Sequence, residues 1–174
     1  QNISHCFLII NSENALIIED LRKTGITVHY LKHRNLFTHF YNLHQTVKIF
    51  KKYNANVIHT ELPYGNLIGL LAAYICKIKV RITTASNLTW AKDYKNFKQK
   101  VIDKLTFKLA TKIIAQTELS KEFLNKEYKI ENSKIKTIWH SLKIEAYENV
   151  NSERIESLKK KYHVQENDFI VGII

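Results

Sequence analysis

Short apolar runs rich in isoleucine and valine alternate along the chain with longer stretches in which apolar residues recur every three or four positions. The short runs are typical of buried strands, and the longer stretches are typical of amphipathic helices. The predicted strands cover residues 6–10, 26–31, 56–60, 79–86, 112–117, 134–139 and 168–174. The predicted helices cover residues 13–25, 36–50, 63–76, 93–111, 118–128 and 152–162.

This regular alternation predicts βαβ units, and therefore an α/β fold with a parallel sheet and helices on both faces. Parallel sheets of this kind bind ligands where their strands end. The residues that follow each predicted strand are therefore the first candidates for function. They lie at 59–61, 84–87, 117–120 and 140–143.

The richest of these positions is the segment HTELPYGN at 59–66. Pro63, the only proline of the chain, suits the first turn of a helix because its missing N–H is not needed there. Gly65 and Gly69 are expected to let that helix approach the sheet closely. Backbone geometry explains these residues but not the polar side chains beside them. Those expected to hydrogen-bond a polyhydroxylated ligand are His59, Glu61, Tyr64 and Asn66.

A second polar segment, TTASN at 83–87, closes the predicted strand 79–86. Its side chains favour hydrogen bonding to a ligand, but residues of these types also form ordinary turns. Both interpretations of Thr84, Ser86 and Asn87 stay open at this point.

The chain is basic, with a formal net charge of +11 at pH 7. Lys100, Lys104 and Lys108 form a stripe at i+4 spacing on the predicted helix 93–111, with Trp90 and Tyr94 nearby. This stripe is either the solvated face of a lysine-rich chain or a surface that rests on anionic lipid. Arginine, the preferred side chain for reading base edges, occurs only four times, so we expect no nucleic acid as a partner.

Several chemistries are not supported by the sequence. Only four glycines are present, and they form neither a P-loop nor a G-x-G-x-x-G motif. No H-E-x-x-H or G-x-S-x-G motif occurs, and we expect no metal. Cys6 and Cys76 are too few for a disulfide scaffold and favour reduced thiols in the cytoplasm. The longest apolar run, 67–76, is too short to span a membrane, so any membrane contact is expected to be peripheral, on the inner face.

A known family shares the order of these segments. Bacterial glycosyltransferases of family four carry patterns similar to NVIHTELPYGNLIGLLAAYICKIKVRITTASNL, to IDKLTFKLATKIIAQTELSKEFL and to KIKTIWHSLKIEAYENV. The final FIVGII resembles the first strand of that family's second domain. The chain also begins at Gln1, contains no methionine and ends inside a predicted strand, which indicates a piece of a longer protein.

The resemblance implies the GT-B architecture, in which two Rossmann-like domains face each other across a cleft. Residues 1–150 would form the acceptor-side domain, without its first strand. Residues 151–174 would form a linker helix and the first strand of a truncated nucleotide-sugar-binding domain. The resemblance further implies transfer of a sugar, typically a hexose with retention of configuration, from a nucleotide-sugar and without a cofactor. The expected acceptor is a lipid-linked saccharide in capsule or lipopolysaccharide biosynthesis. The main catalytic residues are expected in the missing domain, so this chain alone is expected to be inactive.

The resemblance also assigns candidate residues, with some departures. Glu61 stands where the family usually has a histidine, and Ala85 and Ser86 replace a glutamate and a histidine. Two alternatives remain beside this interpretation: a GT-B enzyme that acts as a nucleotide-sugar epimerase, and a non-catalytic basic α/β module that binds membrane or nucleic acid. The residues carried over from the family are His59, Asn66, Thr84, Asn87 and Thr117.

Overall fold

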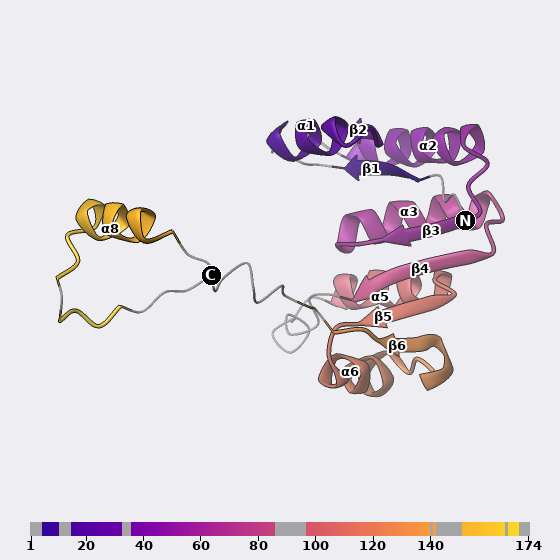
Figure 1. Ribbon diagram of the computed structural model, residues 1–174. Coiled ribbons are helices and arrows are strands. Elements are labelled where there is room, and N and C mark those ends of the chain that lie inside the picture. Colours follow the sequence, from indigo (N-terminus) through magenta and orange to yellow (C-terminus); the bar gives the residue numbers. More distant parts are fainter. Residues whose placement is uncertain are drawn as a thin grey trace. The chain divides into compact units, whose positions relative to one another are not determined.

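A computed structural model of the chain describes residues 5–10, 15–32, 36–85, 97–139, 141, 151–165 and 167–170. It contains two compact units, Gln1–Trp139 and His140–Ile174. Figure 1 shows the alternation of strands and helices in the first unit.

The first unit contains the secondary structure that the hydrophobic pattern predicts. Its strands are β1 (Cys6–Ile10), β2 (Thr27–Leu31), β3 (Val57–Thr60), β4 (Val80–Ala85), β5 (Lys112–Ala115) and β6 (Ile135–Thr137). Its helices are α1 (Ala15–Lys23), α2 (Leu36–Lys52), α3 (Pro63–Ile75), α5 (Phe97–Leu109) and α6 (Glu118–Tyr128), with a 3-10 turn η1 at Asn132–Lys134. Each predicted strand and helix of this unit is confirmed with ends that differ by a few residues, and the start of the predicted helix 93–111 lies outside the described residues.

All strand pairs of the described residues are parallel, which confirms the predicted α/β class. The strands form two sheets, one with the order β1-β2 and one with the order β3-β4-β5-β6. Helix α3 contacts β1 as well as β3 and β4, and therefore links the two sheets. An apolar cluster includes Leu8 of β1, Ile58 of β3 and Phe50 of α2, so the sheets are joined through side-chain packing.

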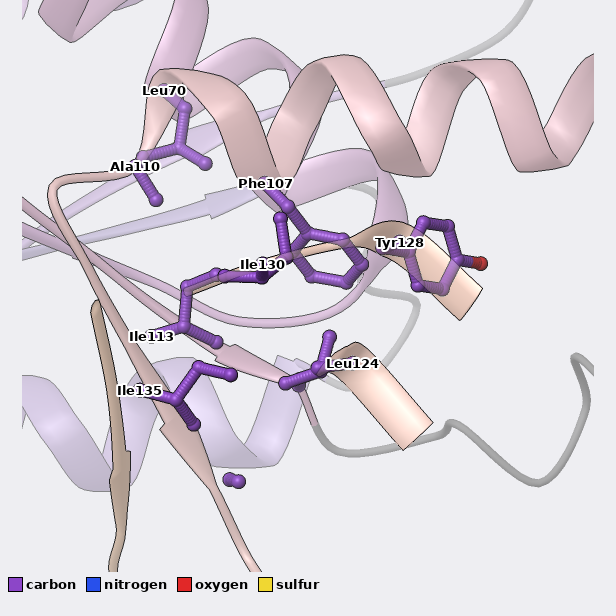
Figure 2. Close-up of a cluster of buried hydrophobic side chains, with 10 residues drawn as sticks. Leu70, Phe107, Ala110, Ile113, Leu124, Tyr128, Ile130 and Ile135 are labelled. Atoms are coloured by element: carbon purple, nitrogen blue, oxygen red, sulfur yellow. The ribbon is translucent and has the colours of Figure 1, made fainter. Parts of the chain in front are cut away.

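The main core lies between the four-stranded sheet and the helices α3, α5 and α6 (Figure 2). Leu70, Ile113 and Leu124 are completely buried there. Burial of one such side chain contributes about 1.5–3 kcal/mol to folding. Tyr128 packs edge-on against Phe107, and its hydroxyl donates to the Asp103 carboxylate at 3.2 Å. The core thus holds α5 and α6 on one face of the sheet.

Helix α3 approaches β3 closely at one glycine. A Cβ atom added to Gly69 would lie 2.6 Å from Thr60 Cγ2, whereas a Cβ atom added to Gly65 would have no neighbour within 4 Å. The prediction that both glycines permit close packing is therefore confirmed for Gly69 and wrong for Gly65, because Gly65 lies at a more open place on the helix.

The last carbonyl groups of α5 lack helical N–H partners and are bonded by cationic side chains instead. Arg81 Nε, near the start of β4, donates to the Leu109 carbonyl at 2.7 Å. Lys134 Nζ, just before β6, donates to the Phe107 and Lys108 carbonyls at 2.7 and 3.2 Å. Burial, followed by the nearby Arg81 guanidinium, lowers the pKa of the Lys134 ammonium. We call this region, built around Arg81 and Lys134 where the strands begin, the amino edge.

The second unit contains helix α8 (Ser152–Lys161). Asn151 caps the helix, because its side-chain oxygen accepts from the Glu153 N–H at 2.8 Å. The predicted helix 152–162 is thus confirmed. The described part of the predicted strand 168–174, Asp168–Ile170, is not a strand, because none of the described strand pairs includes it. The other residues of that prediction lie outside the described ones.

Candidate functional site

Three of the predicted site residues meet where β3 and β4 end. The two strands are in register, with Thr60 opposite Thr83. His59 Nε2 lies 2.8 Å from Thr84 Oγ1. Thr84 Oγ1 donates to Glu61 Oε1 at 3.4 Å, and Glu61 Oε1 lies 3.9 Å from His59 Nε2. We call His59, Glu61 and Thr84 the polar triad.

The triad joins a buried hydroxyl to two accessible side chains. Thr84 is 4% exposed, whereas the side chains of His59 and Glu61 are 45% and 64% exposed. The Thr84 hydroxyl is therefore held inside the sheet by β4. The His59 imidazole and the Glu61 carboxylate contact it on the side that is open to solvent. This arrangement offers a hydroxyl-rich ligand a charged acceptor and a histidine side by side.

The connection from the triad to α3 is strained. Leu62 follows Glu61 and has φ 65° and ψ 149°, although it is not a glycine. It also precedes Pro63, and a residue before proline normally adopts an extended conformation with negative φ. Pro63 occupies the first turn of α3 as predicted. Backbone strain of this kind, typically about 1–3 kcal/mol, is concentrated at functional sites.

Tyr64 lies in a separate group of polar side chains. Its hydroxyl is 3.0 Å from His39 Nδ1 and accepts from Asn42 Nδ2 at 3.3 Å. Asn42 Nδ2 also donates to the Lys32 carbonyl at 3.1 Å, and the residue is completely buried. The sequence pattern did not predict this role of His39 and Asn42. Their i,i+3 spacing on α2 was the available signal, and it is a weak one because many helices carry such pairs.

Asn66 is buried in the second turn of α3 and is 7% exposed. Its side-chain oxygen Oδ1 has no hydrogen-bond partner in the part of the chain that the structure describes. The hydroxyl of Thr83, next to the triad in β4, is likewise buried and unpartnered among the described residues. Leaving a buried polar atom without a partner costs about 1–3 kcal/mol, so these two atoms are suited to a ligand or a water molecule.

The remaining predicted site residues are not brought together with the triad by any described contact. Thr117 caps α6, since its hydroxyl accepts from the Ser120 N–H at 3.0 Å and donates to Ser120 Oγ at 2.9 Å. This contact gives Thr117 a structural role. Ser86 and Asn87 lie outside the described residues. We use the name carboxyl edge for the polar triad together with Leu62 and Asn66.

The lysine stripe on α5 is only partly available to a partner. Lys100 Nζ forms an ion pair with Glu127 of α6 at 2.9 Å, and Lys100 thereby lowers the pKa of the Glu127 carboxyl. Lys104 and Lys108 are exposed, and the ion pairs of the described residues include neither. Val101 and Leu105, at the same helical spacing, are exposed large apolar side chains. Trp90 and Tyr94 lie outside the described residues.

Within the described ranges, no cluster of three or more His, Cys, Asp or Glu side chains could hold a metal ion. A membrane-spanning helix is also absent from those ranges, since none of their helices is both long and apolar enough.

A parallel sheet with polar side chains at its strand ends is typical of an α/β domain of the Rossmann-like type. The pattern of Glycosyltransferase Family 4 matches residues 11–145, and the chain belongs to this family. It is 27% identical over 146 residues to the capsular polysaccharide biosynthesis glycosyltransferase CapM of Staphylococcus aureus, covering 80% of this chain and 37% of CapM. The chain thus spans well under half the length of this relative.

Solved structures support the same fold. A glycosyltransferase from Rickettsia africae is similar with a TM-score of 0.63 and 25% identity, over 94% of this chain and 42% of that protein. Anabaena HepE, solved with UDP and glucose, gives a TM-score of 0.71 at 12% identity, over 90% of this chain and 42% of HepE. The GT-B prediction is thereby confirmed at the level of fold.

A UDP-GlcNAc 2-epimerase from Methanocaldococcus jannaschii is also similar, with a TM-score of 0.59 and 20% identity, over 75% of this chain and 36% of the epimerase. At this identity the likeness concerns the fold alone. Family membership therefore favours the transferase over the epimerase interpretation.

Proposed function

We propose that this chain is the acceptor-side part of a glycosyltransferase that moves a sugar from a nucleotide-sugar to a saccharide in cell-surface polysaccharide biosynthesis. The observation that carries this proposal is the polar triad at the ends of β3 and β4, in a chain that belongs to Glycosyltransferase Family 4. A relative that makes capsular polysaccharide supports the same pathway class.

The triad suits the recognition of hydroxyl groups. Glu61 accepts hydrogen bonds, and His59 can accept or donate depending on its tautomer. The unpartnered oxygen of Asn66 adds a buried acceptor on α3. Sugars carry several hydroxyls that act as donors and acceptors at once, so clustered polar groups of this kind bind them with defined orientation. Glu61 takes the place of the family's usual histidine and is our first candidate for acceptor selectivity.

We propose that the donor binds to a second domain outside these 174 residues. The chain covers 37% of CapM, and we propose that the nucleotide-sugar and the main catalytic groups belong to the remaining part of the enzyme. The transfer is proposed to be metal-independent, to move a hexose and to retain the anomeric configuration. The 174-residue chain alone is then inactive toward every nucleotide-sugar.

The acceptor is proposed to be lipid-linked, and the exposed face of α5 is proposed to rest on the anionic membrane that carries it. Val101 and Leu105 would contact the apolar boundary, and Lys104 and Lys108 would contact lipid phosphates. Mixed apolar and basic faces of this kind are typical of helices that lie at a membrane surface. Lys100 contributes less than the sequence indicates, because Glu127 already neutralises it.

Transfer of radiolabelled sugar from UDP-glucose and UDP-N-acetylglucosamine to bacterial membranes tests the function in the complete enzyme. Glu61→Gln and His59→Ala are expected to lower kcat/KM at least tenfold, the scale of one lost hydrogen bond to a charged group. Glu131 is an exposed carboxylate near η1. Its substitution Glu131→Gln is the matched control and should leave transfer unchanged. Unaltered transfer by both triad variants would contradict the proposed site, and epimerised nucleotide-sugar as the product would support the epimerase instead.

Flotation with vesicles tests the membrane surface. The double variant Lys104→Glu/Lys108→Glu is expected to lose binding to vesicles that contain anionic phosphatidylglycerol, since each lysine near such a surface contributes about 1 kcal/mol. Lys159→Glu/Lys160→Glu on α8 makes the same change of charge and is the control. Equal losses in both variants would show that net charge, and not the face of α5, governs binding. Salt-sensitive binding to RNA would favour the nucleic-acid alternative.

A further inference from the structure

The two hydrogen bonds of the polar triad restrict where its protons can lie. An ionised carboxylate only accepts hydrogen bonds, and a threonine hydroxyl has a single proton to donate. With this proton directed to Glu61 Oε1 at 3.4 Å, the 2.8 Å contact between Thr84 Oγ1 and His59 Nε2 needs a proton on the histidine nitrogen. We propose that Glu61 is a positioning residue that acts through Thr84 and holds His59 in the Nε2–H tautomer.

The geometry excludes a direct hydrogen bond between Glu61 and His59. His59 Nε2 and Glu61 Oε1 are 3.9 Å apart, which is beyond hydrogen-bond distance. Hydrogen bonding between the carboxylate and the imidazole therefore runs through the hydroxyl between them. Thr84 is buried, and among the described residues the acceptors for its hydroxyl proton are the carboxylate and the imidazole. The ionised carboxylate is the stronger acceptor of the two.

The consequence lies at the other ring nitrogen. When Nε2 carries the proton of a neutral imidazole, Nδ1 presents a lone pair. Within the described ranges, the His59 ring has the triad contacts alone. Nδ1 is thus an acceptor for a ligand hydroxyl, while Nε2 is already occupied. This deepens the proposed function and rests on it for the identity of the ligand: the site would select a hydroxyl that donates its proton toward His59.

The chain provides an internal reference for the measurement. His44 on α2 is exposed, and none of the hydrogen bonds or ion pairs among the described residues involves its ring. Its tautomer therefore follows the intrinsic preference of imidazole in water. The ring nitrogens of His59 are identified by the signals that disappear in His59→Gln.

The test is ¹⁵N NMR of the imidazole nitrogens in the ligand-free 174-residue chain, at a pH where His44 is neutral. In the wild type, we expect His59 to be almost entirely Nε2–H. Glu61→Ala removes the acceptor, so the Thr84 proton turns toward His59 Nε2 and the Nδ1–H fraction rises several-fold. A dominant Nδ1–H form in the wild type, or an unchanged ratio in Glu61→Ala, would overturn the proposal.

Two further variants separate hydrogen bonding from packing. Glu61→Gln keeps a side-chain oxygen that can accept from Thr84, so the Nε2–H form should persist. Thr84→Val keeps the shape of the side chain but removes the relay, so the His59 ratio should approach that of His44. Persistence of the wild-type ratio in Thr84→Val would assign the tautomer to another cause. These measurements use no substrate, so failure of sugar transfer in the complete enzyme would refute the proposed function without affecting this result.

Discussion

The two edges of the four-stranded sheet use polar residues in opposite ways. At the amino edge, Arg81 and Lys134 donate to the carbonyl groups that end α5. At the carboxyl edge, the His59 and Glu61 side chains are exposed to solvent, and the Asn66 oxygen is buried without a partner among the described residues. Satisfied buried polar groups stabilise a fold, whereas unsatisfied and accessible ones are available to a ligand. We therefore propose that stability is concentrated at the amino edge and ligand recognition at the carboxyl edge.

The largest expected effect concerns Arg81 at the amino edge. Arg81→Ala should lower the free energy of unfolding by about 3 kcal/mol, because hydrogen bonds to charged groups contribute about 1.5–3 kcal/mol and the Leu109 carbonyl loses its donor. Thr84→Val, on the same strand but at the carboxyl edge, should cost less than about 1 kcal/mol, because its partners can turn to water. Urea unfolding measures both variants. Equal losses of unfolding free energy in the two variants would contradict the claim that the amino edge stabilises the fold more than the carboxyl edge.

Gly69→Ala tests the one close contact that holds α3 near the carboxyl edge. The added methyl would lie 2.6 Å from Thr60 Cγ2, and the resulting shift should cost about 2 kcal/mol in thermal or urea unfolding. Gly65→Ala in the same helix meets no atom within 4 Å and should be neutral or stabilising by up to about 1 kcal/mol. A similar loss in both variants would indicate a general intolerance of α3 rather than contact with Thr60.

Relief of backbone strain at Leu62 should stabilise the fold, unlike the substitutions at Arg81 and Gly69. Its φ of 65° is readily adopted by glycine, so Leu62→Gly should raise the free energy of unfolding by about 1 kcal/mol. The gain should appear as a higher urea midpoint with an unchanged slope. A destabilised variant would mean that the Leu62 side chain, and not its backbone, supports this edge.

The smallest effect concerns the ion pair between Lys100 and Glu127. Lys100 lowers the pKa of the Glu127 carboxyl, so the pair stabilises the fold above the ordinary pKa of glutamate and loses this contribution as pH falls through the lowered value. Lys100→Ala should raise the pKa of Glu127 toward its ordinary range in an NMR titration of the carboxyl groups. Lys104→Ala should leave that pKa nearly unchanged, and an equal shift in both variants would contradict the specific pairing.

The sequence predicted the strands and helices well because apolar periodicity is a local property. It also brought His59 and Thr84 to one site, since both follow from the rule that parallel strands end at the same edge. It did not predict that Tyr64 contacts α2 and not the triad. The direction of a side chain in the first turn of a helix depends on the neighbouring elements that pack against that turn. The contact of Tyr64 with His39 and Asn42 joins residues from α2 and α3, and no local pattern encodes such a contact.

The dependence on tertiary packing also explains why the predictions for the lysine stripe and for Gly65 were incomplete or wrong. Helical spacing placed Lys100, Lys104 and Lys108 on one helix, but only the packing of α6 beside α5 shows that Lys100 faces Glu127. The sequence alone does not distinguish Gly65 from Gly69. Only the structure shows that Gly69 faces Thr60 closely and that Gly65 does not.

Mapping of amide shifts in the ¹⁵N-labelled 174-residue chain during titration with glucose and N-acetylglucosamine tests the central claim most directly. The account predicts shifts that gather around Glu61 and Thr84 at the carboxyl edge and that are lost in Thr84→Val. Shifts that gather around Arg81 and Lys134, or shifts that persist unchanged in Thr84→Val, would contradict it.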